Sequence, residues 1–160
     1  MLRYLGAICI FIFTFYSIFA YEKYQKRKMA VIDAFFSFLK FLEGEIASLG
    51  RPTAECVPDF PQKDALPAPF FSLLAEGASP SEAYAAVRDA LPVSADMDAC
   101  LLAAFTGFSG SRAVLGRSLA QARERYETLL DAERAQQGRR TRLFRTLSSA
   151  SAMGIVILLL

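Results

Sequence analysis

The chain has 160 residues, 54% of them hydrophobic, and its 18 basic and 16 acidic side chains leave a formal net charge of +2. It contains no histidine, which removes the commonest general base and metal ligand. The three cysteines, at positions 9, 56 and 100, lack the spacing of a zinc site or a redox motif. No phosphate-binding loop or nucleophile elbow occurs either, so the composition argues against an enzyme and predicts no cofactor and no metal.

The first apolar segment, from Tyr4 to Tyr21, contains no charged residue. As a helix it would cover roughly 27 Å of a hydrocarbon core about 30 Å thick, so we expect an N-terminal transmembrane helix in residues 1–22. A cleaved signal peptide is the alternative. It fits less well, because the dense positive charge follows the apolar run and Ile18 stands where a cleavage site would need a small residue.

A second uncharged segment covers residues 146–160 and includes the apolar run from Ile155 to Leu160. From Leu147 onward a helix would be about 21 Å long, which is short for a membrane crossing. We expect a short C-terminal transmembrane helix, whose mismatch local thinning or homo-oligomerisation would relieve. A helix that only dips into the membrane, or that packs on a partner, stays open as the alternative.

Basic residues flank both apolar segments on the side of the middle region: Lys23, Lys26, Arg27, Lys28, Arg139, Arg140, Arg142 and Arg145. The positive-inside rule therefore places a domain of residues 23–145 in the cytoplasm. Within it, residues 29–111 carry four basic and eleven acidic side chains, whereas residues 112–145 carry nine arginines and four acids. An arginine-rich stretch next to a membrane favours contact with anionic lipid. No nucleic-acid-binding motif accompanies it, so we expect no nucleic-acid partner.

The middle region predicts only helices. Apolar residues at spacings of three and four indicate an amphipathic helix over Val31–Leu49, closed by Gly50. A helical turn around Thr53–Val57 and a proline-rich connector come next. Further helices are expected from Phe70 to a break at Gly77, from a capping box at Ser79 to Pro92, and from a cap at Ser94 to a corner at Gly107–Gly110.

The longest expected helix begins at Ser111 and meets no proline before Leu160, with Gly138 as a plausible bend. Its apolar positions step by four and three in a coiled-coil-like stripe: Leu115, Leu119, Ala122, Tyr126 and Leu129. Arg123 and Glu127 can pair across one turn. Since no strand signal competes anywhere, the fold class is all-α, a membrane-anchored helical bundle.

Three short motifs resemble the stage III sporulation protein AB family: Phe41–Ile46 with the Gly-x-Pro turn that follows, the Phe105-Thr106-Gly107 corner, and Arg142–Leu147 running to Leu160. Two features depart from the family pattern. Ser111-Arg112-Ala113 follow the corner where the family usually has an acidic residue and glutamine, and the last segment has serines where the family favours glycines. Contacts specific to the corner are therefore not carried over.

The family's soluble helices are similar to the cytoplasmic domain of the type II secretion inner-membrane platform protein. The resemblance implies a non-enzymatic platform in a channel or feeding-tube complex between mother cell and forespore, located in the mother-cell membrane around the forespore. The implied partners are a cytoplasmic secretion-type ATPase, membrane lipid and the other membrane components of the complex.

Two groups of charged residues are candidate partner or lipid contacts: Glu43, Glu45 and Glu55, and Arg139, Arg140, Arg142 and Arg145. Ordinary solvated faces explain both groups about as well. Two other functions also stay open. One is a platform of a type II secretion or pilus system outside sporulation, which gene neighbourhood would distinguish. The other is a lipid-binding or regulatory membrane protein that acts alone through its arginines, which predicts salt-sensitive binding to anionic liposomes.

Overall fold

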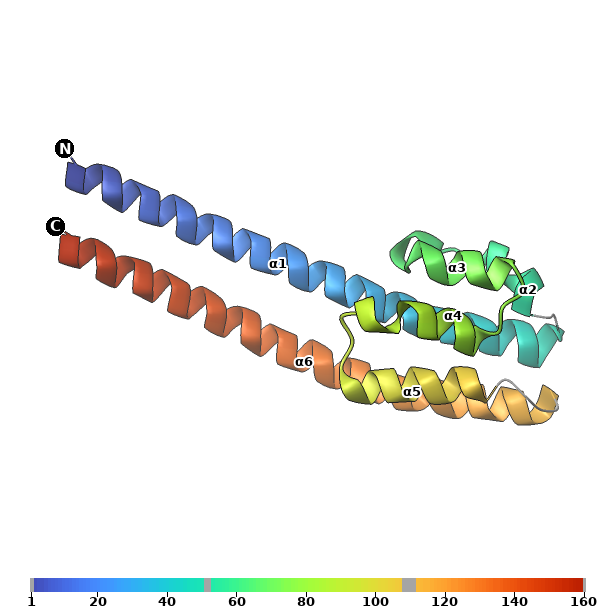
Figure 1. Cartoon of the computed structure of the whole chain (residues 1–160). Helices are drawn as coiled ribbons and strands as arrows, with labels where there is room; N and C mark the ends of the chain where they lie inside the picture. Colours follow the sequence, from blue (N-terminus) through green and yellow to red (C-terminus); the bar gives the residue numbers. More distant parts are fainter. Residues whose placement is uncertain (1, 51–52, 108–111, 160) are drawn as a thin grey trace. The chain divides into compact units, whose positions relative to one another are not determined.

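The computed structural model describes residues 2–50, 53–107 and 112–159, and every regular element in them is helical. The all-α fold class is therefore confirmed. The chain divides into two compact units (Figure 1). Met1–Arg27 and Glu133–Leu160 form what we call the terminal unit, and Lys28–Ala132 form the central unit.

Two long helices each supply segments to both units. Helix α1 covers Leu2–Leu42 and helix α6 covers Arg112–Leu159. The helix expected to begin at Val31 is the later part of α1, because residues 7–42 contain no glycine or proline that would end a helix. Helix α6 continues through Gly138, as the absence of proline predicts, and its expected start at Ser111 lies outside the described residues.

After Leu42 the helix widens into a π-helix, η1, over Glu43–Leu49. Gly50 ends it in the left-handed conformation, with φ 66°, and its N–H donates to the carbonyls of Glu45 and Ile46. A residue without a Cβ adopts this conformation readily, so the predicted cap is confirmed. The rest of the Gly-x-Pro turn, residues 51–52, lies outside the described part of the chain.

Short helices fill the middle of the central unit: α2 (Thr53–Cys56), η2 (Val57–Asp59), η3 (Lys63–Ala65), α3 (Ala68–Ala75), α4 (Pro80–Val87), η4 (Arg88–Ala90) and α5 (Ala95–Thr106). The capping box is confirmed, because Ser79 Oγ accepts from the Glu82 N–H and the Glu82 carboxylate accepts from the Ser79 N–H. Helix α4 ends before the expected Pro92. Because a proline disfavours helical geometry at the residue before it, Leu91 is extended. Between α4 and Leu91 the chain forms the short 3-10 helix η4. The corner residues 108–110 are outside the description.

The core of the central unit is a cluster of aromatic rings packed largely edge to face. Phe38 lies at its centre, with ring centroids 5.2 Å from Phe60 and 5.4 Å from Phe70. Phe35 packs against Tyr84 at 5.9 Å. Offset and edge-on rings add about 0.5–1.5 kcal/mol per pair beyond the area they bury, so this cluster holds α1 against α3 and α4. Apart from tyrosine and cysteine, no buried polar or charged residue occurs among those described.

Helix α6 closes this core with the predicted stripe. Leu115, Leu119 and Tyr126 are buried, and Ala122 and Leu129 pack partly buried beside them. The Tyr126 hydroxyl donates to the carbonyl of Ile32 at 3.2 Å, a contact between α6 and α1 within the central unit. A buried tyrosine needs such a polar partner, so the register of the two helices is set by one hydrogen bond as well as by packing.

In the part of the chain that the structure describes, no helix combines the length and the apolarity needed to cross a membrane. The two expected transmembrane helices thus gain no support from the structure. The expected division into residues 1–22, 23–145 and 146–160 depends on which segments lie in a membrane. The structure does not test this, so the division stays a prediction.

Candidate interaction surfaces

The first candidate carboxylate, Glu43, is engaged inside the central unit. Its Oε2 lies 2.7 Å from Arg123 Nε, and Arg123 also reaches Glu127 at 3.7 Å, the predicted pair across one turn of α6. Both members of the Glu43–Arg123 pair are only partly exposed. Glu43 therefore joins η1 to α6 and presents less of its charge to a partner than a solvated carboxylate would.

Glu45 and Glu55 lie in the same region of the central unit. The Cys56 thiol is 3.9 Å from Glu45 Oε2, and Glu55 immediately precedes Cys56 on the short helix α2. Glu45 is half-buried, whereas Glu55 is exposed. Of the three candidate carboxylates, Glu55 is the one most accessible to another molecule.

A polar cluster that the sequence did not predict joins α4, η4 and α5. Asp98 accepts hydrogen bonds from the Tyr84 hydroxyl at 2.8 Å and from Arg88 Nε at 2.8 Å. The Arg88 guanidinium, with a smaller contribution from Tyr84, lowers the pKa of Asp98. Burial and the Asp98 carboxylate together raise the pKa of Tyr84, so the phenol stays protonated. The cluster stabilises the corner between these helices.

Cys100 borders a small cavity of about 250 Å³ between α5 and α6. Its thiol lies 3.5 Å from the Ala122 carbonyl, and burial raises its pKa, which reduces the thiolate needed for nucleophilic attack. Among the described residues, no three metal-ligating side chains come together.

In the terminal unit, the early part of α1 and the late part of α6 lie side by side and antiparallel, with both chain ends at the same end of the pair (Figure 1). Two adjacent contacts join them. The rings of Tyr21 and Phe144 stack with centroids 4.3 Å apart, and Arg145 Nε donates to the carboxylate of Glu22. The candidate contact Arg145 is thus already held within the unit.

Around this ion pair lies what we call the basic cleft, with a volume of about 480 Å³. Four cationic side chains and one carboxylate line it together with polar residues: Lys26, Arg134, Arg142, Arg145, Glu22, Gln25, Gln137, Gly138 and Thr141. Two of the four predicted arginines, Arg142 and Arg145, therefore come together here with Lys26 from α1. The other two, Arg139 and Arg140, are exposed on α6 outside the cleft.

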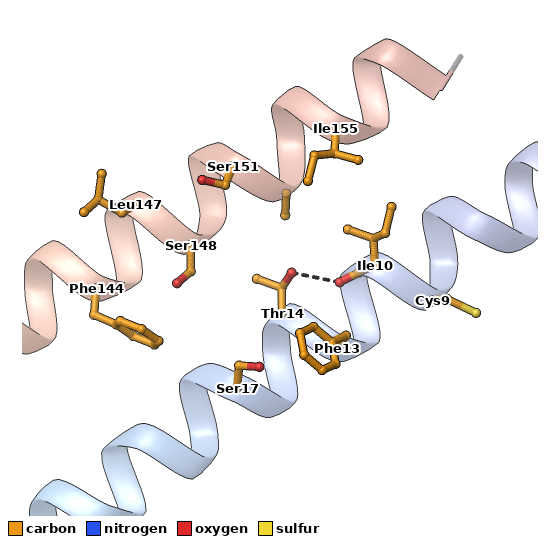
Figure 2. Close-up of a pocket in the computed structure, with 11 residues that line it drawn as sticks. Cys9, Ile10, Phe13, Thr14, Ser17, Phe144, Leu147, Ser148, Ser151 and Ile155 are labelled. Atoms are coloured by element: carbon orange, nitrogen blue, oxygen red, sulfur yellow. Dashed lines mark hydrogen bonds between the residues drawn. The ribbon is translucent and has the colours of Figure 1, made fainter.

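Beyond Phe144 the same two helices enclose what we call the apolar groove, with a volume of about 750 Å³ (Figure 2). Its lining is apolar or small: Cys9, Ile10, Phe13, Thr14, Ser17, Phe144, Leu147, Ser148, Ser151, Ala152 and Ile155. Figure 2 shows Ser148 and Phe144 pointing from α6 toward α1. Thr14 donates to the Ile10 carbonyl of its own helix, so its hydroxyl adds little free polarity to the groove.

The terminal unit carries many exposed large apolar side chains, some of which line the apolar groove. Phe15 is 77% exposed and Phe13 is 72% exposed, and Tyr16 and Phe19 are similarly open. On α6, Leu143, Leu147 and Ile157 are exposed in the same way. Large exposed apolar patches are typical of sites where lipid or another protein binds.

Residues 3–160 match the family described as stage III sporulation protein AB. The chain belongs to that family. The match covers all but the first two residues, so the resemblance seen in the three short motifs is confirmed and the protein is related to sporulation. The family is not known as a family of enzymes. No curated protein and no solved structure matches the chain.

Sequence reasoning missed several contacts in this member of the stage III sporulation protein AB family. Glu22 and Arg145 are 123 positions apart, and the sequence contains no local pattern that pairs them. Asp98 lies in the first turn of α5, where an acid is favourable for the helix, and that position alone does not indicate its contacts with Tyr84 and Arg88. The one signal in the sequence for the contact between Arg88 and Asp98 was their opposite charge, ten residues apart across a turn that contains a proline.

Proposed function

We propose that the protein is a non-enzymatic platform component of a sporulation channel or feeding-tube complex. In this proposal the terminal unit anchors the protein in the membrane as a two-pass helical pair, and the central unit lies in the cytoplasm. The central unit binds the complex's secretion-type ATPase and couples it to the other membrane components of the assembly. Membership of the stage III sporulation protein AB family supports the sporulation context.

The observation that carries the anchoring is the exposure of aromatic and aliphatic side chains on the terminal unit. Leaving such side chains in water costs about 25 cal/mol for each Å² of apolar surface, and lipid removes that cost. The most exposed members are Phe13, Phe15 and Ile157. Basic residues that follow the apolar segment of α1 and precede that of α6, including Lys23 and Arg142, favour the cytoplasmic side of an anionic membrane.

Features of the central unit support a docking role. Its core is closed and apolar among the described residues, and residues 29–111 carry eleven acids against four basic side chains. An acidic surface favours a partner with a basic face, because complementary charge speeds association and excludes wrong partners. Glu55 is the exposed candidate on that surface.

The anchoring is tested by fractionating sporulating cells that produce the full chain. We expect the protein to stay in the membrane pellet after a carbonate wash and to be released by detergent. Recovery in the carbonate supernatant would contradict the membrane platform.

The docking is tested with a photo-crosslinking amino acid in place of Glu55. A matched position is Glu76, an exposed carboxylate of the same unit outside the candidate group. Crosslinks to the ATPase at position 55 but not at position 76 are expected. Equal yields at both positions, or none at either, would remove this surface as the docking site. A platform for a type II secretion or pilus system remains the alternative, and pilin genes beside this one would favour it.

A further inference from the structure

We propose that the terminal unit binds one anionic phospholipid along a single side of the α1–α6 pair. The phosphate lies in the basic cleft, and the first part of one acyl chain lies in a second pocket that adjoins the cleft. The inference rests on the proposed membrane location and names a ligand of the terminal unit. It follows from the wall that the two pockets share, from their contrasting linings and from their order along the helices.

The second pocket, which we call the Phe15 pocket, has a volume of about 480 Å³. It shares two lining residues, Glu22 and Arg145, with the basic cleft. The ion pair between these two residues therefore marks the boundary at which pocket and cleft meet. The other lining residues are three apolar and two hydroxyl side chains: Phe15, Ile18, Phe19, Thr146 and Ser149.

Pocket and cleft together follow one face of each helix. On α6 their linings run from Arg134 through Thr141 and Arg145 to Ser149. Residues three, four or seven positions apart lie on the same face of a helix, so one elongated molecule can contact both pockets. The apolar groove shares no lining residue with either of them and is not part of the site. On α1 the same spacing connects Phe15, Ile18, Phe19, Glu22, Gln25 and Lys26.

The basic cleft has the chemistry of a phosphate site. Four cationic side chains and one carboxylate line it, so the lining has a positive balance. The carboxylate is Glu22, whose charge is compensated by Arg145 at the boundary with the Phe15 pocket. Lys26 and Arg142 are exposed, one on each helix. Guanidinium groups bind phosphate oxygens in a matching two-pronged geometry, and basic pockets between helices at the cytoplasmic side of a membrane bind anionic headgroups.

The Phe15 pocket suits a hydrocarbon chain. Phe15 and Phe19 are 77% and 60% exposed, so their rings are accessible to a ligand. The Thr146 hydroxyl donates to the Arg142 carbonyl at 2.9 Å, and the Ser149 hydroxyl donates to the Thr146 carbonyl at 3.0 Å. Because both hydroxyl protons are used within α6, these two residues add little free polarity to the pocket.

The length of the Phe15 pocket sets how much of the chain it holds. From Phe15 to Glu22 a helix rises about 10 Å, whereas one leaflet of a bilayer contributes about 15 Å of hydrocarbon. The pocket therefore holds the part of an acyl chain nearest the headgroup, and the rest of the chain continues into the bilayer.

The order of the two pockets matches the proposed orientation in the membrane. The Phe15 pocket precedes the cleft along α1 and follows it along α6, so the apolar part of the site is the part nearer the two chain ends. In the proposed topology those ends lie across the membrane, and the cleft lies at the cytoplasmic interface where anionic headgroups gather. A small anion would fill only the cleft and an uncharged hydrocarbon only the Phe15 pocket, whereas an anionic lipid fits both.

A second copy of the chain is the competing occupant of this face. Packed on it with two-fold symmetry, the copy would bring its own Lys26 and Arg142 against those of the first. Like charges at close range oppose such a contact, whereas an anionic lipid neutralises them.

The test measures lipids retained by the full-length protein in mild detergent, using native mass spectrometry. Phosphatidylglycerol and phosphatidylcholine with the same acyl chains are offered in equal amounts. The wild type should retain phosphatidylglycerol preferentially. Lys26→Gln with Arg142→Gln should reduce that preference about tenfold, since each basic side chain beside an anionic headgroup contributes several-fold to binding.

Matched variants separate a built site from general attraction. Lys23→Gln with Arg139→Gln removes the same two kinds of charge from the same two helices, at exposed positions outside the cleft, and should leave the preference nearly unchanged. Ser149→Phe fills the Phe15 pocket and should reduce retention of both lipids. Ala150→Phe, at an exposed position that lines neither pocket, should not. Circular dichroism spectra that match the wild type would establish that all four variants are folded.

Three results would overturn the site. The first is an equal loss of preference in both charge-removing pairs, which indicates diffuse attraction. The second is full displacement of phosphatidylglycerol by inorganic phosphate, which indicates a free-anion site. The third is equal lipid retention by Ser149→Phe and Ala150→Phe, which indicates that no acyl chain lies in the Phe15 pocket; a dimer that only Ser149→Phe dissociates would then identify a second copy as the occupant. A protein that resists carbonate extraction yet shows any of these loses only the lipid site, whereas extraction by carbonate defeats the proposed function itself.

Discussion

At the scale of single residues, Asp98 connects the two neighbouring helices of the central unit. It accepts from the buried Tyr84 hydroxyl and from Arg88, and the resulting pKa of Asp98 is below its ordinary value. A carboxylate with a lowered pKa stabilises the folded state at neutral pH, because the folded protein holds it ionised more firmly than the unfolded chain does. That stabilisation is complete above the ordinary pKa of 3.8 and disappears as the pH falls through the lowered value.

We expect Asp98→Asn to lower the free energy of unfolding at pH 7 by about 1 kcal/mol, through the weakened hydrogen bond of the Tyr84 hydroxyl. The difference from wild type should shrink as the pH falls below the ordinary aspartate pKa of 3.8 and Asp98 itself becomes protonated. Urea denaturation followed by circular dichroism at neutral and at acidic pH measures this. Asp96→Asn removes a charge from the same helical turn at an exposed position and serves as the control. A gap for Asp98→Asn that stays constant with pH would contradict the assignment.

At the scale of elements, glycines end two helices of the central unit. Gly50 closes η1 and Gly77 follows α3, with φ values of 66° and 89°. A Cβ at Gly77 would meet nothing within 4 Å, so any cost of substitution there comes from backbone conformation alone. Gly44 offers the opposite case, since it lies inside η1 with open space and no positive φ.

Gly77→Ala should therefore destabilise the protein by about 1 kcal/mol, because residues with a Cβ are strained in the left-handed region. Gly44→Ala should be neutral or stabilising by up to about 1 kcal/mol, because alanine loses less backbone entropy than glycine in a helix. Thermal unfolding of both variants under the same conditions provides the comparison. Equal effects of the same sign would mean that the φ angle of Gly77 is not the cause.

Local signals predicted three of the helix ends. The capping residues Ser79, Ser94 and Gly50 act within four positions of themselves, so reading them needs no tertiary information, and all three are confirmed. The π-helix η1 was not predicted, because no residue type encodes a wider turn and a tertiary contact such as Glu43–Arg123 is invisible in one segment.

The candidate contact residues, too, could be predicted from the sequence only in part. Charge counting identified the arginines of α6, yet it could not tell Arg142, inside the basic cleft, from Arg139 outside it. That distinction depends on the antiparallel pairing with α1, which joins parts of the chain more than a hundred residues apart. The sequence motifs that resembled the family were sufficient for its recognition, because they depend on order along the chain and not on pairing.

At the scale of the whole molecule, the proposed function places the terminal unit in membrane lipid and the central unit in water. The terminal unit has exposed apolar side chains, and the central unit has its apolar side chains in a closed core. Native cysteines would be poor reporters of this topology, since Cys56 and Cys100 are buried. Their use as accessible cytoplasmic thiols would therefore fail for reasons of packing alone.

A better reporter is Glu76→Cys in a Cys9→Ser background, since position 76 is exposed in the central unit. We expect an impermeant maleimide to leave it unlabelled in intact cells and to label it after permeabilisation. The parent Cys9→Ser protein should label only in denaturant, which controls for Cys56 and Cys100. Labelling of the variant in intact cells would reverse the topology and remove a cytoplasmic ATPase as partner.

The hydrogen bond from Tyr126 to Ile32 also bears on how the protein is made. These residues are 94 positions apart. At about 5–20 residues per second, a ribosome needs roughly 5–20 s to add the chain between them. Throughout that interval the α1 turn that contains Ile32 has no α6 to pack against, whereas Phe35 and Phe38 can already pack against Tyr84 and Phe70. The core of the central unit is therefore assembled in two stages during translation, with α6 the last helix to join it.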